Sequence, residues 1–152
     1  MEPYFSDYFD HLQRLHAEIE QVLDGLPQGA LEWVPGDGMN SLGVLAYHVA
    51  GAERFWIGDI VAGDPSNRDR EAEFRTQGID AESLKERLSA SLSYSRAVLE
   101  GLSLHDLLTQ RTSPRDGRQF SVGWALAHAL EHIAVHLGHM QVTRQVWKQG
   151  QN

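Results

Sequence analysis

Residues 122–148 carry a helical pattern that proline does not interrupt and that is apolar on two sides. One apolar set lies opposite a stripe of histidines and consists of Leu126, Leu130, Ile133 and Leu137. The other lies among those histidines and consists of Trp124, Val135, Val142 and Val146. A helix that is apolar all round is usually buried all round. One side must therefore face a bundle interior, and the other faces another part of the chain or a second subunit.

Three further segments repeat apolar residues at helical spacing. They span about residues 4–25, 42–61 and 81–100. Residues with short polar side chains precede these segments, and such side chains accept hydrogen bonds from the backbone N–H groups of a helix's first turn. We expect Asn40 or Ser41 to cap the second helix, Asp80 the third and Ser121 the last.

The second helical segment contains three glycines, Gly43, Gly51 and Gly58. Each lowers the intrinsic helix propensity by ~1 kcal/mol relative to alanine. Small residues also let a neighbouring helix approach closely, so we expect close packing at these positions.

The connections between the helical segments differ in length and character. Residues 62–79 are polar and irregular, so helices two and three need not be hairpin neighbours. Residues 112–120 contain the turn signal Asp116-Gly117 and form either a small hairpin or a loop. Four helical patterns without a convincing strand series predict an all-α four-helix bundle. Its long connection joins helices 2 and 3, and residues 1–152 form a single domain.

Composition excludes several classes of function. The net charge is −8, from 13 basic and 21 acidic residues, and no basic run is present, so we expect no nucleic-acid partner. The sequence contains neither an apolar stretch near 18 residues nor a signal-peptide pattern, so we expect a cytoplasmic protein with no membrane partner. Because the chain has no cysteine, a metal must bind nitrogen or oxygen, and any thiol must come from outside.

Four of the eight histidines lie within twelve residues, at positions 128, 132, 136 and 139. On a helix they form a stripe about 80° wide. His128 and His136 are about 12 Å apart along the axis, too far to share one ion. Three chelating pairs remain open: His128/His132, His132/His136 and His136/His139. A third ligand must come from another helix, and His48 is the best candidate because it lies mid-helix among apolar residues.

Two other interpretations compete with this one. His128, Glu131 and His132 match the inverted zinc-peptidase signature H-x-x-E-H, in which the histidines bind zinc and the glutamate is the general base. The larger chain and the distant acidic ligand of such peptidases are not apparent. Alternatively, the histidines cluster without function, although burying each unpartnered polar group costs on the order of 1–3 kcal/mol.

Two stretches carry a resemblance to a known family. Residues 40–49, NSLGVLAYHV, resemble the run N-S-(I/L)-G-x-L-x-x-H-(L/V) of the DinB/YfiT-like helical-bundle family of metalloenzymes. Residues 132–140, HIAVHLGHM, are similar to its run H-x-x-x-H-x-G-(Q/H)-(I/M) in the last helix. Length, helix order and the long connector also agree, so the resemblance covers nearly the whole chain.

The resemblance implies that His48, His132 and His136 are the metal ligands. His139 stands where many members have glutamine, and it either lines the pocket or contacts a ligand or cofactor. His128, one turn before the pair, is expected to pack near the site rather than bind the ion, and Glu131 is expected at a surface or interface.

Three histidines leave a coordination position open, which is typical of a catalytic site. We expect zinc or nickel, with iron or manganese as further candidates. Characterised relatives include transferases that use low-molecular-weight thiols and a thiol-dependent isomerase. The resemblance therefore implies a metal-dependent thiol S-transferase acting on a small molecule. The alternatives are a metal-dependent hydrolase and a non-catalytic metal- or ligand-binding stress-response bundle.

A homodimer is the expected assembly. The last helix offers more apolar surface than one bundle interior needs, and Trp56, Trp124 and Trp147 add large side chains near helix ends or edges. A two-fold interface would bury this surplus. The competing expectation is that residues 62–79 and 102–120 fold back and cover it.

Overall fold

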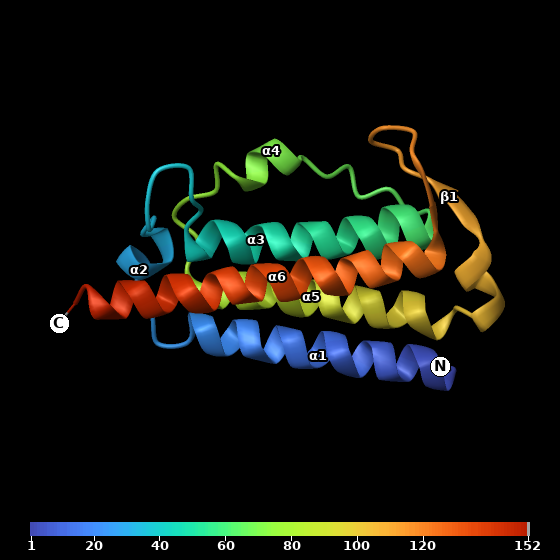
Figure 1. Cartoon of the computed structure of the whole chain (residues 1–152), viewed down its shortest axis with the longest axis horizontal. Helices are drawn as coiled ribbons and strands as arrows, with labels where there is room; N and C mark the ends of the chain where they lie inside the picture. The colour runs from blue at the N-terminus through green and yellow to red at the C-terminus, as the bar shows by residue number, and fades with distance from the viewer. Residues whose placement is uncertain (152) are drawn as a thin grey trace.

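Four long helices lie side by side in the computed structural model, which describes residues 1–151 (Figure 1). They are α1 (Pro3–Leu23), α3 (Leu42–Glu53), α5 (Ala81–Glu100) and α6 (Val122–Gln149). The α3 helix continues directly into a wider, π-helical segment, η1 (Arg54–Ala62). The all-α four-helix bundle expected from the sequence is confirmed. The bounds of α1, α5, α6 and of α3 taken together with η1 lie within about two residues of those expected.

The connection from η1 to α5 sets the topology of the bundle. It runs back along the outside of α3, so α3 and α5 point in the same direction although they are consecutive long helices (Figure 1). Each long helix contacts two neighbours around the core, in the order α1, α5, α3, α6. The expected long connection between helices 2 and 3 is therefore present.

Several short elements fill the connections. They are α2 (Gln28–Glu32), α4 (Arg70–Glu73), the 3-10 helix η2 (Leu104–Leu108), and strands β1 (Gln110–Thr112) and β2 (Gln119–Ser121). The two strands pair antiparallel with Arg111 opposite Phe120, so the open choice between hairpin and loop resolves as a hairpin. Residues 62–79, expected to be irregular, contain α4, whose first turn is capped by Asp69 Oδ1 accepting from Ala72 N–H.

The caps expected at three helix starts are present. Ser41 Oγ accepts from Val44 N–H, and Asp80 Oδ1 accepts from Ser83 N–H. Ser121 Oγ accepts from the backbone N–H of the third residue of α6. Each satisfies a backbone donor that a helix start leaves without an internal partner.

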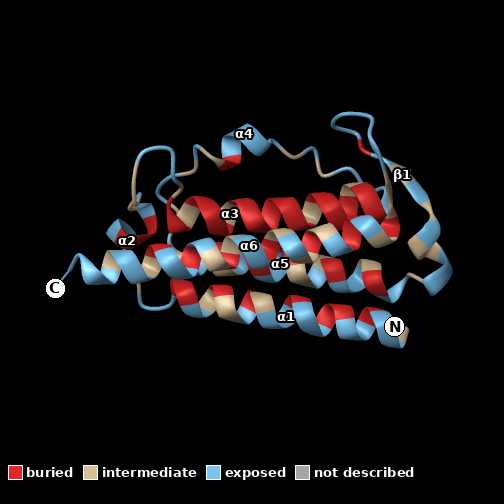
Figure 2. Ribbon diagram, viewed as in Figure 1, coloured by how far each residue is buried: buried red, intermediate tan, exposed pale blue. Residues whose placement is uncertain are grey.

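The core lies between the four long helices, and α3 is buried along nearly its whole length (Figure 2). A buried polar cluster also crosses this core. Glu53 at the end of α3 contacts His16 Nε2 of α1 at 2.5 Å and accepts from Ser95 Oγ of α5 at 2.6 Å. Glu53 thereby links three helices, and its two carboxylate oxygens each have a partner.

The second apolar side of α6 faces outward. Leu126, Ile133 and Leu137 are buried, as expected for the bundle side. The outward stripe remains 43–59% exposed and consists of Trp124, Val135, Val142 and Val146. The segments 62–79 and 102–120 therefore leave these four side chains uncovered within the described residues. Across residues 1–151, no helix combines the length and apolar character that crossing a membrane requires.

Candidate metal centre

Three histidine side chains converge where α3 packs against α6. His48 lies in the middle of α3, and His132 and His136 lie one turn apart on the facing side of α6. Each offers a ring nitrogen, and these three atoms lie within 4.8 Å of one another. The Nε2 atoms of His48 and His132 are 3.2 Å apart. Of the three chelating pairs that the sequence leaves open, the structure brings only His132/His136 together with His48.

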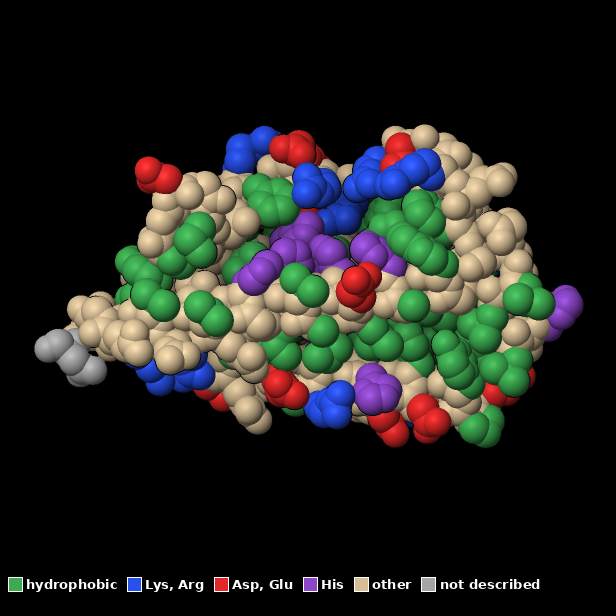
Figure 3. Space-filling model, viewed as in Figure 1, with side chains coloured by type: hydrophobic (Ala, Val, Ile, Leu, Met, Phe, Trp, Pro, Cys, Tyr) green, Lys and Arg blue, Asp and Glu red, His purple; other side chains and the backbone are tan. Residues whose placement is uncertain are grey.

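The three residues differ in how deeply they lie. His48 is 3% exposed, whereas His132 and His136 are partly exposed. Figure 3 shows a row of histidine side chains at the floor of a surface hollow, with Lys and Arg side chains along one border. The cluster is therefore supported from inside the bundle and reachable from one side by a small molecule.

A carboxylate fixes the orientation of the His48 ring. Glu73 Oε2 lies 2.9 Å from His48 Nδ1, and Arg68 holds Glu73 through two bonds, Nε to Oε1 and Nη2 to Oε2, both 2.7 Å. Arg68 Nη2 also lies 3.2 Å from His48 Nδ1. A guanidinium has no acceptor, so Nδ1–H cannot donate to Arg68. We therefore infer that Nδ1 carries the ring proton and donates it to the nearer group, the Glu73 carboxylate. The lone pair of His48 then lies on Nε2, the atom that faces His132.

The charge state of this support follows from the same contacts. Burial by itself would raise the pKa of Glu73, but the hydrogen bonds from Arg68 and His48 and the positive charge of Arg68 outweigh it and lower that pKa. Glu73 is therefore an anion at neutral pH. An anionic carboxylate behind a histidine increases the basicity of the nitrogen on the opposite side of the ring.

His132 and His136 are held in their neutral form. Burial, followed by the charges of neighbouring histidines, lowers the pKa of His132 to about 3. The same causes lower the pKa of His136 to about 4. A metal binds neutral imidazole, so both residues are ready to bind at neutral pH.

The spacing of the donor atoms fits a divalent ion. Two zinc–nitrogen bonds of about 2.0–2.1 Å at a tetrahedral angle place their nitrogens about 3.4 Å apart, close to the 3.2 Å between the Nε2 atoms of His48 and His132. The Nδ1 atoms of His132 and His136 are buried without a hydrogen-bond partner. Each such group costs stability, so these two histidines are not explained by packing alone.

The remaining candidates lie beside the cluster. The His128 ring stacks on Trp124 at 4.9 Å between centroids and packs edge-on against Trp56 at 4.6 Å. Its Nδ1 lies 3.3 Å from Glu131 Oε2, and the Glu131 side chain is 72% exposed. His132 faces His48 but His128 does not, so the two histidines of the H-x-x-E-H motif are not brought together with His48. The His139 ring is exposed, 5.6 Å from that of His136, so it borders the hollow without joining the cluster.

Sequence reasoning missed Glu73 and Arg68. Both lie in the connector after η1, whose irregular polar sequence carries no periodicity that would place it against α3. The available signal was local: Asp69 is a good helix N-cap, and Glu73 ends the short segment that it starts. That signal predicts a helical turn but does not predict its partner.

Comparisons with known proteins identify the family and the fold. The family-level comparison matches the DinB superfamily over residues 11–140. No match was found among curated proteins.

Three solved structures share the fold at low identity. A conserved protein from Enterococcus faecalis is 15% identical, with 95% of this chain and 97% of that chain covered and a TM-score of 0.80. YfiT from Bacillus subtilis, described as a probable metal-dependent hydrolase with an unusual four-helix bundle topology, is 14% identical, with 97% and 90% covered and a TM-score of 0.79. A DinB-like protein from Bacillus cereus is 17% identical, with 93% and 91% covered and a TM-score of 0.74. Since the family match spans most of the sequence, the chain belongs to the DinB superfamily.

Proposed function

We propose that this chain is a divalent-metal-dependent enzyme in which His48, His132 and His136 hold the ion. The observation that carries the proposal is the convergence of three ring nitrogens within 4.8 Å, drawn from two different helices. Three protein ligands leave room for a further ligand, which is the pattern of catalytic rather than structural zinc sites. The hollow over the histidines provides a route for that ligand (Figure 3).

Zinc or nickel is our first assignment for the ion, and iron or manganese is the next. Neutral imidazole suits each of these metals, and no thiolate or carboxylate belongs to the cluster to select a softer or harder ion. The buried support from Glu73 favours tight binding of whichever ion is present.

The reaction that we propose is transfer of a low-molecular-weight thiol to an electrophilic small molecule. A divalent ion supplies the positive charge that lowers the pKa of a thiol at its open position. The thiol sulfur forms a bond to an electrophilic carbon, the bond from that carbon to its leaving group breaks, and the leaving group departs with the electron pair. The thiol proton passes to solvent. The absence of cysteine from the chain fits an external thiol.

In this proposal the chain's own residues position the reactants. His48, held by Glu73, keeps its Nε2 directed at the cluster, while α6 keeps the other two histidines one turn apart. His139 borders the hollow and is placed to contact a bound substrate or thiol. The stacked rings of Trp124 and His128 lie on α6 next to the cluster, on the side of His132.

Metal-dependent hydrolysis is the second candidate. It is favoured by the description of YfiT, a relative of the same fold, as a probable metal-dependent hydrolase. In hydrolysis, water replaces the thiol as nucleophile, and the same three histidines would hold the ion.

Product formation with and without thiol separates the two reactions. The metal-replete chain is incubated with bacillithiol, mycothiol or glutathione and 1-chloro-2,4-dinitrobenzene, and in parallel with p-nitrophenyl acetate without thiol. Metal-dependent conjugation that His132→Ala removes supports transfer, whereas ester cleavage with the same dependence supports hydrolysis. His11→Ala is the matched control, since His11 is exposed on α1 and contacts Arg14. Metal retention with neither activity favours a non-catalytic binding bundle.

A further inference from the structure

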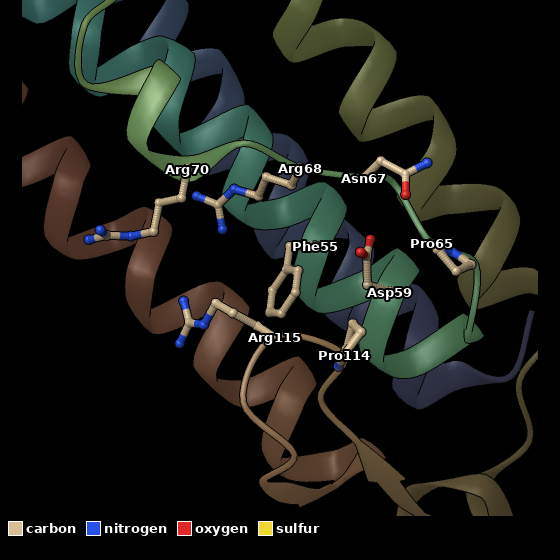
Figure 4. A pocket seen from close by; sticks show the side chains of 8 residues that line it. All are labelled: Phe55, Asp59, Pro65, Asn67, Arg68, Arg70, Pro114 and Arg115. Atoms are coloured by element: carbon tan, nitrogen blue, oxygen red, sulfur yellow. The ribbon is translucent and has the colours of Figure 1, made fainter.

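A cavity of about 250 Å³ lies next to the candidate metal centre. It is lined by residues of η1, the connector and the β-hairpin turn: Phe55, Asp59, Pro65, Asn67, Arg68, Arg70, Pro114 and Arg115. Arg68 joins the two sites, because it lines the cavity and its Nη2 lies 3.2 Å from His48 Nδ1. Figure 4 shows Arg68, Arg70 and Arg115 around one space beside α6, the helix that carries the two partly exposed histidines.

The three arginines are not equally available to a ligand. Arg68 is 10% exposed and is committed to Glu73 through two short bonds. The Arg70 and Arg115 side chains are each 48% exposed, and each has one long contact with the next residue in sequence, at 3.3 Å and 3.5 Å. A guanidinium has five N–H donors in a planar fork, so both retain most of their hydrogen-bonding capacity.

Nearby carboxylates do not cancel this charge. Asp59 is 5% exposed, and its Oδ1 accepts from Arg54 Nη1 and from the backbone N–H of Ser66. Asp116, the contact of Arg115, accepts a shorter bond of 2.9 Å from Arg118 Nε. The cavity lining therefore carries three arginines against one aspartate, in a chain whose net charge is −8. An excess of positive charge in a cleft attracts anionic ligands.

Both exposed arginines also contact aromatic rings near the cavity. The Arg70 guanidinium lies over the Phe74 ring at 4.8 Å, and Phe74 packs on the His48 ring at 4.7 Å between centroids. The Arg115 guanidinium lies 5.7 Å from the Phe55 ring, which lines the same cavity. Through Phe74, Arg70 is connected to His48, and Arg115 shares the cavity with Arg70.

We propose that the substrate of this site carries an oxyanionic group, a carboxylate or a phosphate-type group, which Arg70 and Arg115 bind while the reacting end lies at the three histidines. The inference rests on the proposed metal-dependent function and names its substrate class. Arginine forks match the planar or tetrahedral oxygens of such groups and can bind them through two parallel hydrogen bonds. A neutral analogue of the same size lacks the charge that these bonds require.

Direct titration of the purified chain tests this inference without any turnover. Succinate, methylphosphonate and the neutral analogue succinamide are titrated by calorimetry into the zinc-loaded and the chelator-stripped protein. The test variant is Arg70→Gln/Arg115→Gln. The matched control is Arg14→Gln/Arg96→Gln, which removes the same two charges from α1 and α5, away from the cavity. Circular dichroism establishes that both variants remain folded.

We expect the test variant to weaken binding of at least one anion by tenfold or more, the control to change it less than twofold, and succinamide not to bind. A loss confined to succinate selects a carboxylate, and one confined to methylphosphonate selects a phosphate-type group. Equal affinities in test variant and control, or no anion binding by wild type, would overturn the inference. Because binding is measured without turnover and in the stripped protein as well, failure of metal binding or of catalysis is distinguishable from failure of the arginines.

Discussion

Glu73 is the residue through which the long connector acts on the candidate metal centre. Its carboxylate contacts His48 Nδ1 and is held in turn by Arg68. We predict that Glu73→Gln lowers metal affinity by about 10–100-fold, the usual effect of losing such a support. The amide keeps the size of the side chain but removes the charge that orients the ring. Competition with a chromophoric chelator measures the affinity.

Glu71→Gln is the matched control for this prediction. It removes a carboxylate from the same short helix, but the Glu71 side chain is 74% exposed and contacts only Arg70. Its metal affinity should stay within twofold of wild type. Equal effects of the two substitutions would show that Glu73 does not position His48.

Substituting the histidines distinguishes the pair His132/His136 from the inverted-peptidase pair His128/His132. We predict that His132→Ala or His136→Ala removes most metal binding and that His48→Ala removes nearly as much, because two protein donors remain in each case. His128→Ala should change the affinity far less, since its ring stacks on tryptophans instead. If His128→Ala abolishes binding while His136→Ala does not, the inverted-peptidase pairing is correct. Equilibrium dialysis with zinc provides the measurement.

Sequence reasoning reached the histidines but not their support. His48 stood out because an imidazole in the middle of an apolar helix needs a partner, and His132 and His136 stood out by their helical spacing. Glu73 is 25 positions from His48, in a segment without periodicity. Its contact depends on the path of the connector over α3, which no local pattern specifies.

At the scale of elements, α4 packs against α3 where α3 has a glycine. A Cβ atom at Gly51 would lie 2.0 Å from Glu73 Oε1 and 2.8 Å from Glu73 Cδ. The sequence predicts close packing at Gly51, and the structure shows that the buried carboxylate of Glu73 from the short helix α4, rather than one of the long helices, occupies the space. The absence of a side chain at Gly51 therefore allows Glu73 to reach His48.

We predict that Gly51→Ala displaces Glu73 and weakens metal binding by tenfold or more, because the buried carboxylate has little room to move. Gly29→Ala is the matched control, since a Cβ there meets no atom within 4 Å. Metal affinity and thermal unfolding are measured for both variants. An unchanged affinity in Gly51→Ala would show that Glu73 can shift without loss of its contact.

The long helices were predictable, whereas two other elements were not. Apolar periodicity and caps located α1, α3, α5 and α6 because each has enough turns to show a pattern. The four residues of α4 are too few for a period. In η1 the helix widens from α to π geometry while its apolar residues stay buried. Apolar spacing along the sequence does not distinguish the two kinds of helix.

For the whole molecule, the outward stripe of α6 supports the expectation of a homodimer. Trp124, Val135, Val142 and Val146 remain exposed along one side of the helix. Pairing with a second copy would bury the stripe on both chains. We predict a mass about twice 17.0 kDa by light scattering at micromolar concentration.

The double substitution Val135→Lys/Val142→Lys should shift that mass to the monomer, because two buried charges would face their own copies across the interface. Ser89→Lys/Ser93→Lys is the control, because it adds the same two charges at exposed positions of α5, a different helix. A wild-type mass near 17.0 kDa would contradict the dimer.

The central claim is that three histidines from two helices bind one divalent ion. Elemental analysis tests it directly on protein purified without a chelator and without a histidine tag. We predict about one divalent ion per chain in the wild type and in His11→Ala, and a small fraction of that in His132→Ala/His136→Ala. Wild-type protein without bound metal after incubation with zinc and nickel, or equal metal in the wild type and the double variant, would contradict the claim.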